Sequence, residues 1–294
     1  MKQSWFNYLP LALVIGWWLY DLQFQWRQLA EYNFGWLVLL LVIYLSWERR
    51  SALSSRDDTP ASFWIGAAFA LLGTPFVLLA ELYKQAIANS PAASFCLSLG
   101  CLCFVLSNVL YLHGWRTTRH FLFPLLFFLL AVPLPGIIWT PIVLGLKTAI
   151  TSIDVEALNL IGIPAMQQAN VIRLPACAVG VDEACSGIRS LQSSFMAALF
   201  IGNLKFRRAS AQSIFFIMGI GLALTGNFLR SLFLAMIAHH KGLEALKQFH
   251  DSAGWSIFAF TAVGLLMVAR FIGRIEPEHL PTKHAKDTKI GSSN

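Results

Sequence analysis

The amino-acid sequence predicts an all-α integral membrane protein with about eight transmembrane helices and both termini in the cytoplasm. Composition is the first indication: of the 294 residues, 56% are hydrophobic and only 13% are charged, and the mean hydropathy is +0.61. These values are typical of polytopic membrane proteins and exclude an ordinary globular domain. The second indication is that apolar residues gather in runs long enough to cross a bilayer, and the third is that Lys and Arg cluster between those runs.

Eight apolar runs are the expected spans, and we list them in chain order. They are residues 5–20, 34–47, 63–82, 92–112, 121–134, 186–203, 213–238 and 254–271. The first run lacks a small-residue cleavage site, so we expect a retained helix and not a removed signal peptide. Residues 1–275 are therefore predicted to form one membrane domain, and the polar tail 276–294 is predicted to be disordered and cytoplasmic.

The basic residues orient this threading, because most of them fall on one side of it. That side holds 14 of the 22 Lys and Arg residues: Lys2, Arg49, Arg50, Arg56, Arg116, Arg119, Lys205, Arg207, Arg208, Arg270, Arg274, Lys283, Lys286 and Lys289. By the positive-inside rule this side is cytoplasmic. The net charge of +7 is thus explained by basic residues in the cytoplasmic loops. The sequence has no basic stripe interleaved with aromatic residues, so we expect no nucleic-acid partner.

The longest extracytoplasmic region is expected at residues 135–184, before the sixth span. Pro133-Leu134-Pro135-Gly136 ends a helix. Residues 137–161 have helical periodicity and few charges, so we expect a helix that lies in the interface or dips into the bilayer. Residues 171–175 are predicted to be extended, and such a segment could present an edge to an extended peptide.

Three reactive side chains fall at one depth in this threading, although the topology did not require it. Cys185 lies at the outer end of the sixth span, Arg230 lies past the midpoint of the seventh towards the outer leaflet, and His250 directly precedes the eighth. A thiol, a cation and an imidazole at one membrane surface suggest acyl-transfer chemistry on a membrane-anchored polypeptide.

Arg230 is the most unusual of the three. A charged side chain inside a span costs roughly 2.5–3.5 kcal/mol, so it normally faces a partner or a water-filled cavity. Asn227 lies one turn earlier on the same helix face and extends the polar patch. The alternative is that the Arg230 side chain snorkels to the interface.

Cys185 stands at a helix N-terminus, where the helix dipole stabilises a thiolate. Ser186 and Gly187 leave room for a substrate backbone. The anions that precede Cys185 raise a thiol pKa, so Arg230 or Arg189 is expected to restore thiolate character. Two alternatives are that Cys185 has only a structural role, or that it forms a disulfide with Cys177, which would block nucleophilic attack.

His250 is the expected acid–base partner, with Asp251 beside it. It competes with His239 and His240, which open the same outer loop, and a lone loop histidine is usually only solvated. The remaining cysteines, Cys96, Cys101 and Cys103, lie in one apolar span, have no zinc-binding spacing and are expected to be small buried hydrophobes. The sequence also lacks H-E-x-x-H, G-x-S-x-G and Walker motifs, so we expect no metal and no cofactor.

With these motifs, the chain resembles the exosortase/archaeosortase family, the multispanning counterparts of sortases. The resemblance rests on Cys185-Ser186-Gly187-Ile188-Arg189, on Asn227-Phe228-Leu229-Arg230, and on His250 followed by Gly254. Pro133-Leu134-Pro135 and Gly162-Ile163-Pro164 are similar to the family as well. Tyr32-Asn33-Phe34-Gly35 matches the family's Y-S-H-G only partly, since it lacks the histidine.

The resemblance implies a cysteine protease or transpeptidase at the outer face of the cytoplasmic membrane. Its substrates would be secreted proteins that end in a sorting signal, made of a short motif, one transmembrane helix and a basic tail. Cys185 would form a thioester, His250 would be the acid–base partner, and Arg230 would stabilise the thiolate or the oxyanion. Two alternatives stay open: a non-enzymatic transporter or assembly factor for envelope polymers, and an inactive member of the family.

Overall fold

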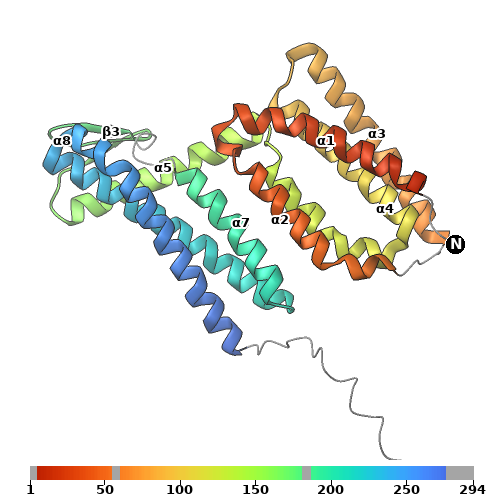
Figure 1. Ribbon diagram of the computed structural model, residues 1–294. Helices are drawn as coiled ribbons and strands as arrows, with labels where there is room; N and C mark the ends of the chain where they lie inside the picture. The colour runs from red at the N-terminus through yellow and green to blue at the C-terminus, as the bar shows by residue number, and fades with distance from the viewer. Residues whose placement is uncertain (1–4, 55–59, 181–186, 276–294) are drawn as a thin grey trace, which may run out of the picture. The chain divides into compact units, whose positions relative to one another are not determined.

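The computed structural model describes residues 5–54, 60–180 and 187–275, and the predicted C-terminal tail lies outside them. The described chain is almost entirely helical (Figure 1) and divides into two compact units, residues 1–149 and 150–294, which we describe separately. In chain order, the elements of the first unit are η1 (Trp5–Tyr8), α1 (Leu9–Gln28), η2 (Ala30–Tyr32), α2 (Gly35–Glu48), η3 (Arg50–Ser54), α3 (Pro60–Ile87), α4 (Pro91–Phe128) and η4 (Leu129–Ala131).

Helix α4 contains two of the expected spans, because it breaks at Gly114. This glycine has φ 78°, a left-handed conformation that favours glycine. Trp18 shows that the chain doubles back there: its indole Nε1 donates to Ser98 Oγ at 2.8 Å, and its ring packs edge-on against Phe128 with centroids 4.7 Å apart. Ser98 and Phe128 lie on opposite sides of the break and yet contact one side chain.

Small residues let α3 and α4 pack closely. A Cβ added to Gly100 would lie 2.5 Å from Val77 Cγ2 and 3.0 Å from the Gly73 carbonyl oxygen. Neither position can therefore carry a side chain without movement of the helices. Close approach at small residues is typical of helix pairs in membranes, where apolar burial supplies little driving force.

The second unit contains the C-terminal end of α5 (Gly136–Leu160), a small sheet, α7 (Gly187–Lys205) and α8 (Ala209–Ile275). Helix α8 breaks at Gly242, with φ 82°, and its two halves run antiparallel (Figure 1). A Cβ on Gly219 would lie 3.2 Å from Leu265, and one on Gly226 would lie 2.9 Å from Ile257. The break therefore separates the two segments that were expected as the seventh and eighth spans.

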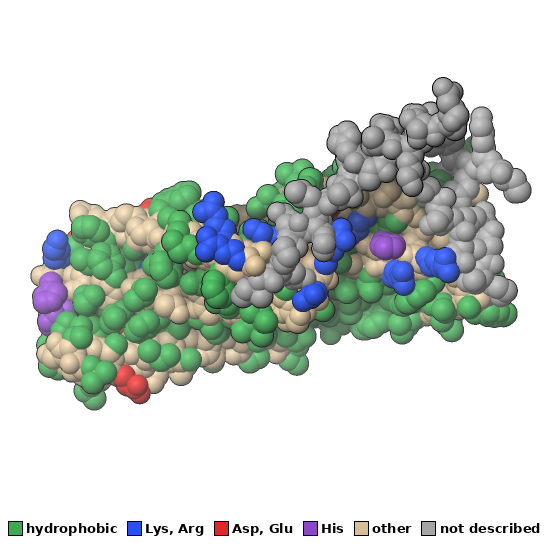
Figure 2. Space-filling model, turned by 90° about the horizontal axis from the view of Figure 1, so that it is seen from below, with side chains coloured by type: hydrophobic (Ala, Val, Ile, Leu, Met, Phe, Trp, Pro, Cys, Tyr) green, Lys and Arg blue, Asp and Glu red, His purple; other side chains and the backbone are tan. Residues whose placement is uncertain are grey.

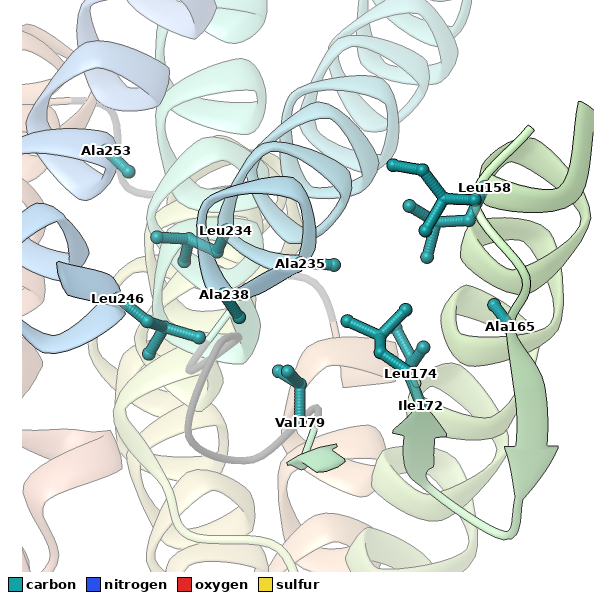
Figure 3. Packing of buried hydrophobic residues seen from close by; sticks show 11 residues of the cluster. Leu158, Ala165, Ile172, Leu174, Val179, Leu234, Ala235, Ala238, Leu246 and Ala253 are labelled. Carbon is teal, nitrogen blue, oxygen red and sulfur yellow. The ribbon is translucent and has the colours of Figure 1, made fainter. Parts of the chain in front are cut away.

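Within the described residues, a three-stranded antiparallel sheet departs from the all-α prediction. Strands β1 (Met166–Gln168), β2 (Val171–Arg173) and β3 (Ala178–Gly180) pair in chain order. The second strand falls where the sequence predicted an extended segment. Ile172 and Val179 are paired across the sheet, are buried, and pack with the α8 residues Leu234 and Ala238 (Figure 3).

Five described helical segments are long and apolar enough to cross a membrane. They are Ala30–Glu48, Ala61–Ile87, Pro91–Ala131, Gly136–Leu160 and Ala209–Arg274. Large apolar side chains are exposed on them, such as Leu71 (77% exposed), and hydrophobic side chains cover much of the surface seen in Figure 2. Extensive apolar surface of this kind is expected to contact lipid. The chain is thus a mainly helical membrane protein, while the count of eight spans and their orientation stay predictions.

The segment expected in the interface is a regular 25-residue helix, α5. It is among the five apolar segments, whereas α1 and α7, which were expected as the first and sixth spans, are not. Its C-terminal end is capped by Gly162, with φ 87°, and Ile163 N donates to Leu158 O at 2.9 Å. The Gly162-Ile163-Pro164 motif therefore ends this helix and starts the turn into the sheet.

Candidate functional site

The structure brings Arg230 and His250 together, although they lie on opposite halves of α8. Arg230 Nη2 lies 3.2 Å from His250 Nε2 and donates to the His250 carbonyl oxygen at 3.4 Å. The chain reversal at Gly242 creates this contact, since the two residues are 20 positions apart. Only 6% of Arg230 is exposed, so the guanidinium is held inside the unit and does not snorkel away from it.

The hydrogen bonds define which imidazole nitrogen carries the proton. A guanidinium has only donors, so the Nε2 of His250 must accept in this contact. The proton of the neutral ring is then on Nδ1, which lies 3.3 Å from Asp251 Oδ1. Asp251 is almost fully exposed, with 96% of its side chain accessible, and so acts on the imidazole through solvent-screened contact only.

The guanidinium retains unused donor capacity. Arg230 Nε is buried and has no acceptor among the described residues. One turn earlier, Asn227 Oδ1 is buried and has no donor among them. Asn227 is only 5% exposed. Buried polar atoms are normally paired, so these two atoms indicate a position that another polar group occupies during function.

Gly254 leaves one side of the Arg230 guanidinium uncovered. A Cβ at this position would lie 3.5 Å from Arg230 Nη2 and 3.7 Å from Cζ, so a larger side chain would extend over the cation. Beside it, a cavity of about 370 Å³ opens between the two halves of α8. It is lined by Leu229, Arg230, Phe233, Phe249, Ser252, Ala253, Ser256 and Ile257.

This cavity was not anticipated from the sequence. Its walls are mainly apolar, with one cation and the hydroxyls of Ser252 and Ser256. Both hydroxyls donate to carbonyls of their own helix, at 2.9 Å in each case, so Arg230 is the group available for a polar ligand. The signal in the sequence was weak, because the lining residues are spread over two helices.

Helix α7 runs alongside the half of α8 that carries Arg230. It packs antiparallel to the first half of α8, since a Cβ on Gly219 would lie 2.8 Å from Ala198 and one on Gly202 would lie 3.2 Å from Phe215. The two contacts belong to one antiparallel register, in which each step forward along α7 is matched by a step backward along α8. Carried on to the start of α7, this register pairs Gly187 with Arg230. Continued without a bend, this register would bring the first turn of α7 level with the arginine.

The remaining predicted site residues are only partly described. Cys185 and Ser186 lie outside the described residues, and so does the side chain of Arg189. Cys177 carries a free thiol, so it forms no disulfide here; its Sγ donates to Ala238 O at 3.7 Å. Burial raises the pKa of the Cys177 thiol, so a smaller fraction of it is thiolate at neutral pH than for an ordinary cysteine.

A buried acid that contacts Ser231, the residue after Arg230 in the chain, was missed by the sequence analysis. Asp154 of α5 is fully buried and accepts a hydrogen bond from the hydroxyl of Ser231, which is equally buried. The second carboxyl oxygen of Asp154 has no partner among the described residues. The available signal was an acidic residue in an apolar helical stretch, which marks functional sites in membranes by default.

The motifs in the first unit have structural roles. The Tyr32 hydroxyl accepts a hydrogen bond from Leu134 N at 3.1 Å, so the Tyr32 motif meets the Pro133-Leu134-Pro135 motif. A Cβ on Gly35 would lie 2.3 Å from Trp26 Nε1, which itself donates to Ala131 O at 2.7 Å. Glycine is therefore required at position 35 by packing.

In the described residues, no three His, Cys, Asp or Glu side chains gather in a way that could hold a metal ion. Comparison with known proteins gives one match. The family model of the transmembrane exosortases matches residues 26–267, which is well over half of the chain. No curated protein and no solved structure matches. The match confirms the resemblance drawn from the cysteine, arginine and histidine motifs, and the chain belongs to the transmembrane exosortase family.

Proposed function

We propose that the chain is a membrane-embedded cysteine protease or transpeptidase that cleaves C-terminal sorting signals of secreted proteins. Cleavage would occur at the outer face of the cytoplasmic membrane and pass through a thioester on Cys185. The observation that carries the proposal is the contact of the buried Arg230 with the half-buried His250, which leaves guanidinium donor capacity unused. The proposal also draws on membership of the exosortase family.

Arg230 is suited to stabilise negative charge. Its guanidinium is buried, permanently charged and already oriented by its bonds to His250, so little reorganisation is needed when an oxyanion forms. In a water-poor site such a donor acts more strongly than in solution. Both a Cys185 thiolate and the tetrahedral oxyanion are suitable partners for it.

His250 is suited to move the proton. Its Nε2 accepts a hydrogen bond from Arg230 in the resting site, so this nitrogen is unprotonated. It takes the thiol proton of Cys185 once the contact with Arg230 Nη2 opens and frees its lone pair. The register of α7 supports the encounter, because continued without a bend it would bring the first turn of α7 level with Arg230, and Cys185 precedes Gly187 by two residues.

The reaction then proceeds in two balanced steps. The Cys185 thiolate attacks the scissile carbonyl, the oxyanion forms beside Arg230, and the C–N bond breaks as His250 gives its proton to the leaving amine. The N-terminal product remains on Cys185 as a thioester. Water or an amine then attacks the thioester, His250 takes the proton of that nucleophile, and the thiol is restored when the acyl group leaves.

A substrate that has its own transmembrane helix gains from this arrangement. Its helix lies in the same bilayer, so the segment next to the helix reaches the enzyme already near the depth of Arg230. The mainly apolar cavity at Arg230 and the small sheet that packs on α8 lie on the same unit and are the surfaces available to that segment. The partners of the chain would thus be membrane-anchored secreted proteins.

A processing gel tests the proposal. A secreted protein with motif, helix and basic tail is co-expressed with wild type, Cys185→Ala, Arg230→Ala or His250→Ala. The matched controls are Cys177→Ala, Arg270→Ala and His240→Ala, which change the same residue types elsewhere in the second unit. The expected result is loss of the shortened product in the three site variants alone, at equal membrane levels.

Processing by Cys185→Ala at the wild-type rate would overturn the protease proposal. If Arg230→Ala were then still inactive, the non-enzymatic transporter or assembly factor would become the better account, since it needs the intramembrane cation and not the thiol.

A further inference from the structure

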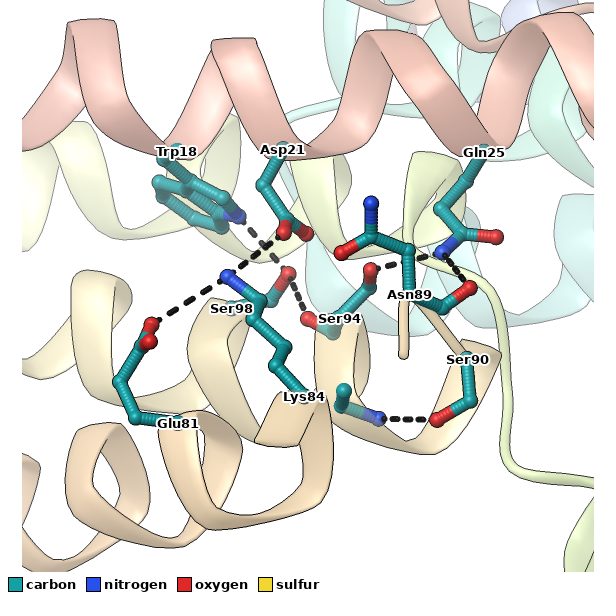
Figure 4. A network of polar contacts seen from close by, with 10 residues as sticks. Trp18, Asp21, Gln25, Glu81, Lys84, Asn89, Ser90, Ser94 and Ser98 are labelled. Carbon is teal, nitrogen blue, oxygen red and sulfur yellow. Dashed lines mark hydrogen bonds and ion pairs between the residues drawn. The ribbon is translucent and has the colours of Figure 1, made fainter. Parts of the chain in front are cut away.

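A second polar site lies in the first unit, where α1 and α3 end and α4 begins. Lys84 Nζ forms an ion pair with Asp21 Oδ1 at 2.9 Å and a longer one with Glu81 Oε1 at 3.3 Å (Figure 4). The side chains of Lys84 and Asp21 are only 19% and 7% exposed. Charged groups at such a place in an apolar helix pair are costly, and they usually mark a ligand path or a binding site.

Hydrogen bonds make this region rigid. Gln25 Nε2 donates to Ser94 Oγ at 3.0 Å and to the Asn89 carbonyl oxygen at 3.3 Å (Figure 4). Ser90 caps α4 by accepting from Ala93 N at 3.2 Å. The ends of three helices are thus held together by several polar contacts, so a cavity at their junction keeps its shape.

Such a cavity is present, with a volume of about 490 Å³. It is lined by aromatic, amide and charged side chains: Trp17, Tyr20, Asp21, Gln23, Phe24, Arg27, Gln28, Lys84 and Asn89. The ammonium of Lys84 is neutralised by the two carboxylates that it contacts. Of the charged lining residues, Arg27 and Lys84 are cations and Asp21 is an anion, and Arg27 is the cation that no described carboxylate contacts.

Arg27 is free to bind a ligand. Its side chain is exposed and makes no hydrogen bond or ion pair with the described residues. The Asp21 Oδ2 oxygen lacks a partner among those residues too, so the polar groups of the cavity are not satisfied by the protein alone. An unpaired guanidinium beside amide side chains is a typical phosphate-binding arrangement.

The cavity also has an apolar side. Trp17, Tyr20 and Phe24 follow one another at helical spacing on α1, and Arg27 continues the same face. These three rings are 39%, 72% and 41% exposed. Exposed aromatic rings next to a cation at a helix end are typical of the membrane interface. A ligand that fits this face is amphipathic, with its charged end at Arg27.

We propose that this cavity binds the headgroup of a membrane phospholipid. The phosphate contacts Arg27 and the side-chain amides of Gln28 and Asn89, and the glycerol and upper acyl chains lie on the three aromatic rings. Basic pockets between transmembrane helices bind lipid headgroups in this way. The site lies in the first unit, shares no residue with the Arg230–His250 site and does not depend on the proposed proteolysis.

The test is native mass spectrometry of the full chain in detergent, titrated with phosphatidylglycerol. Wild type is expected to retain one tightly bound lipid, and Arg27→Ala is expected to bind it about tenfold more weakly, since a charge-assisted contact is lost. Arg50→Ala is the matched control: Arg50 is an exposed arginine whose guanidinium lies 4.2 Å from the Trp47 ring at a helix end, but it lines neither described cavity.

Three probes separate the possible ligands. Diacylglycerol has the chains without the phosphate, inorganic phosphate has the anion without the chains, and phosphatidylcholine has both with no net charge. Binding of both phospholipids and of neither fragment is the expected result. Equal binding of diacylglycerol would reduce the site to an apolar groove, and equal binding of inorganic phosphate would make it a free anion site; either result overturns the proposal.

The variants keep the test informative even if one of them is poorly expressed. Tyr20→Ala removes an exposed ring from the apolar wall and leaves the charges intact, so it should weaken phospholipid binding while the Arg50→Ala control does not. Wild-type affinity in both Arg27→Ala and Tyr20→Ala would show that the retained lipid binds elsewhere, and the assignment would be wrong.

Discussion

Each of the two units contains a buried carboxylate, but the two carboxylates have different partners. Asp21 in the first unit is paired with the ammonium of Lys84 at 2.9 Å. Asp154 in the second unit is fully buried and has only the hydroxyl of Ser231 as a partner among the described residues. A charge that is paired supports a rigid scaffold, whereas one that is not paired costs stability and is retained where function needs it.

The same contrast holds for other polar atoms. Six buried side-chain nitrogen and oxygen atoms have no hydrogen-bond partner in the described part of the chain, and five of them belong to the second unit. These five atoms are Asp154 Oδ1, Gln192 Oε1, Asn227 Oδ1, Arg230 Nε and His239 Nδ1. The second unit, which holds the candidate site, therefore contains most of the unpaired buried polar atoms. Such atoms are expected in a site before its substrate binds.

Breaking the ion pair of the first unit should have the largest effect. Lys84→Met leaves Asp21 buried without its cation, and should lower the free energy of unfolding by about 3 kcal/mol. Because the cost comes from the orphaned carboxylate, Asp21→Leu combined with Lys84→Met should restore most of the stability. Denaturant unfolding of the purified protein in detergent measures both.

The control for that experiment is Lys247→Ala, which removes an exposed ion pair with Glu244, 73% and 86% accessible. It should leave the unfolding midpoint unchanged. If Lys84→Met were as stable as this control, the buried network would not stabilise the first unit, and the contrast between the units would be lost.

The next largest effect should come from Arg230. Arg230→Lys keeps the charge but loses the forked geometry that contacts both Nε2 and the carbonyl oxygen of His250. Processing of a sorting-signal substrate should fall about 100-fold, the usual cost of losing one oxyanion donor. The initial rate of product formation on a gel gives this number, and a fall of less than threefold would contradict the role of Arg230.

Ser231→Ala sharpens the comparison of the two carboxylates. It removes the hydroxyl that donates to Asp154, and should cost about 2 kcal/mol of unfolding free energy because a buried acceptor is left unpaired. Asp154→Leu together with Ser231→Ala should recover the stability, since replacing both partners by apolar groups is nearly neutral. Lower processing activity in this stable double variant would show that the polar pair is retained for function.

Close helix packing gives a smaller difference within the first unit. Gly100→Ala places a methyl group 2.5 Å from Val77 Cγ2 and should cost about 1.5 kcal/mol, in the range found for overpacked cores. Gly16→Ala is the matched variant, because nothing lies within 4 Å of its added Cβ. Equal unfolding midpoints for the two variants would show that α3 and α4 are not in tight contact.

The smallest effect concerns the thiol next to the sheet. Burial raises the pKa of Cys177 above its ordinary value of 9.0, so iodoacetamide should label it slowly at pH 7 and faster as the pH approaches and passes that value. The folded state holds its thiol proton more tightly than the unfolded state does. Stability from this group is therefore present at neutral pH and declines once the pH exceeds the unfolded value. Rapid labelling of Cys177 at pH 7 would contradict its raised pKa.

Part of the site was accessible from the sequence, because its residues interrupt apolar runs. Arg230 and His250 could be found by threading the spans, which also predicted a chain reversal between residues 238 and 254. Their direct contact depends on how the two halves of α8 pack, which the sequence does not give. Asp154 was overlooked because the partner that explains it, Ser231, is 77 residues away.

The fold was predictable to a similar extent. Apolar runs gave the helical membrane class, and the extended segment at residues 171–175 corresponds to β2. The cavity at Arg27 was not foreseen, since its lining comes from α1, α3 and the turn at Asn89, and long-range packing decides whether such residues meet. The Asp21–Lys84 pair was hidden for the same reason, with 63 positions between the two residues.

The central claim is that the Arg230–His250 pair serves a nucleophilic Cys185. The most direct measurement is the intact mass of the enzyme, isolated in acid after co-expression with a sorting-signal substrate. The account predicts an adduct with the mass of the N-terminal product in wild type, released by hydroxylamine as thioesters are, and absent from Cys185→Ala. Cleavage of the substrate by Cys185→Ala, or an adduct that persists in that variant, would contradict it.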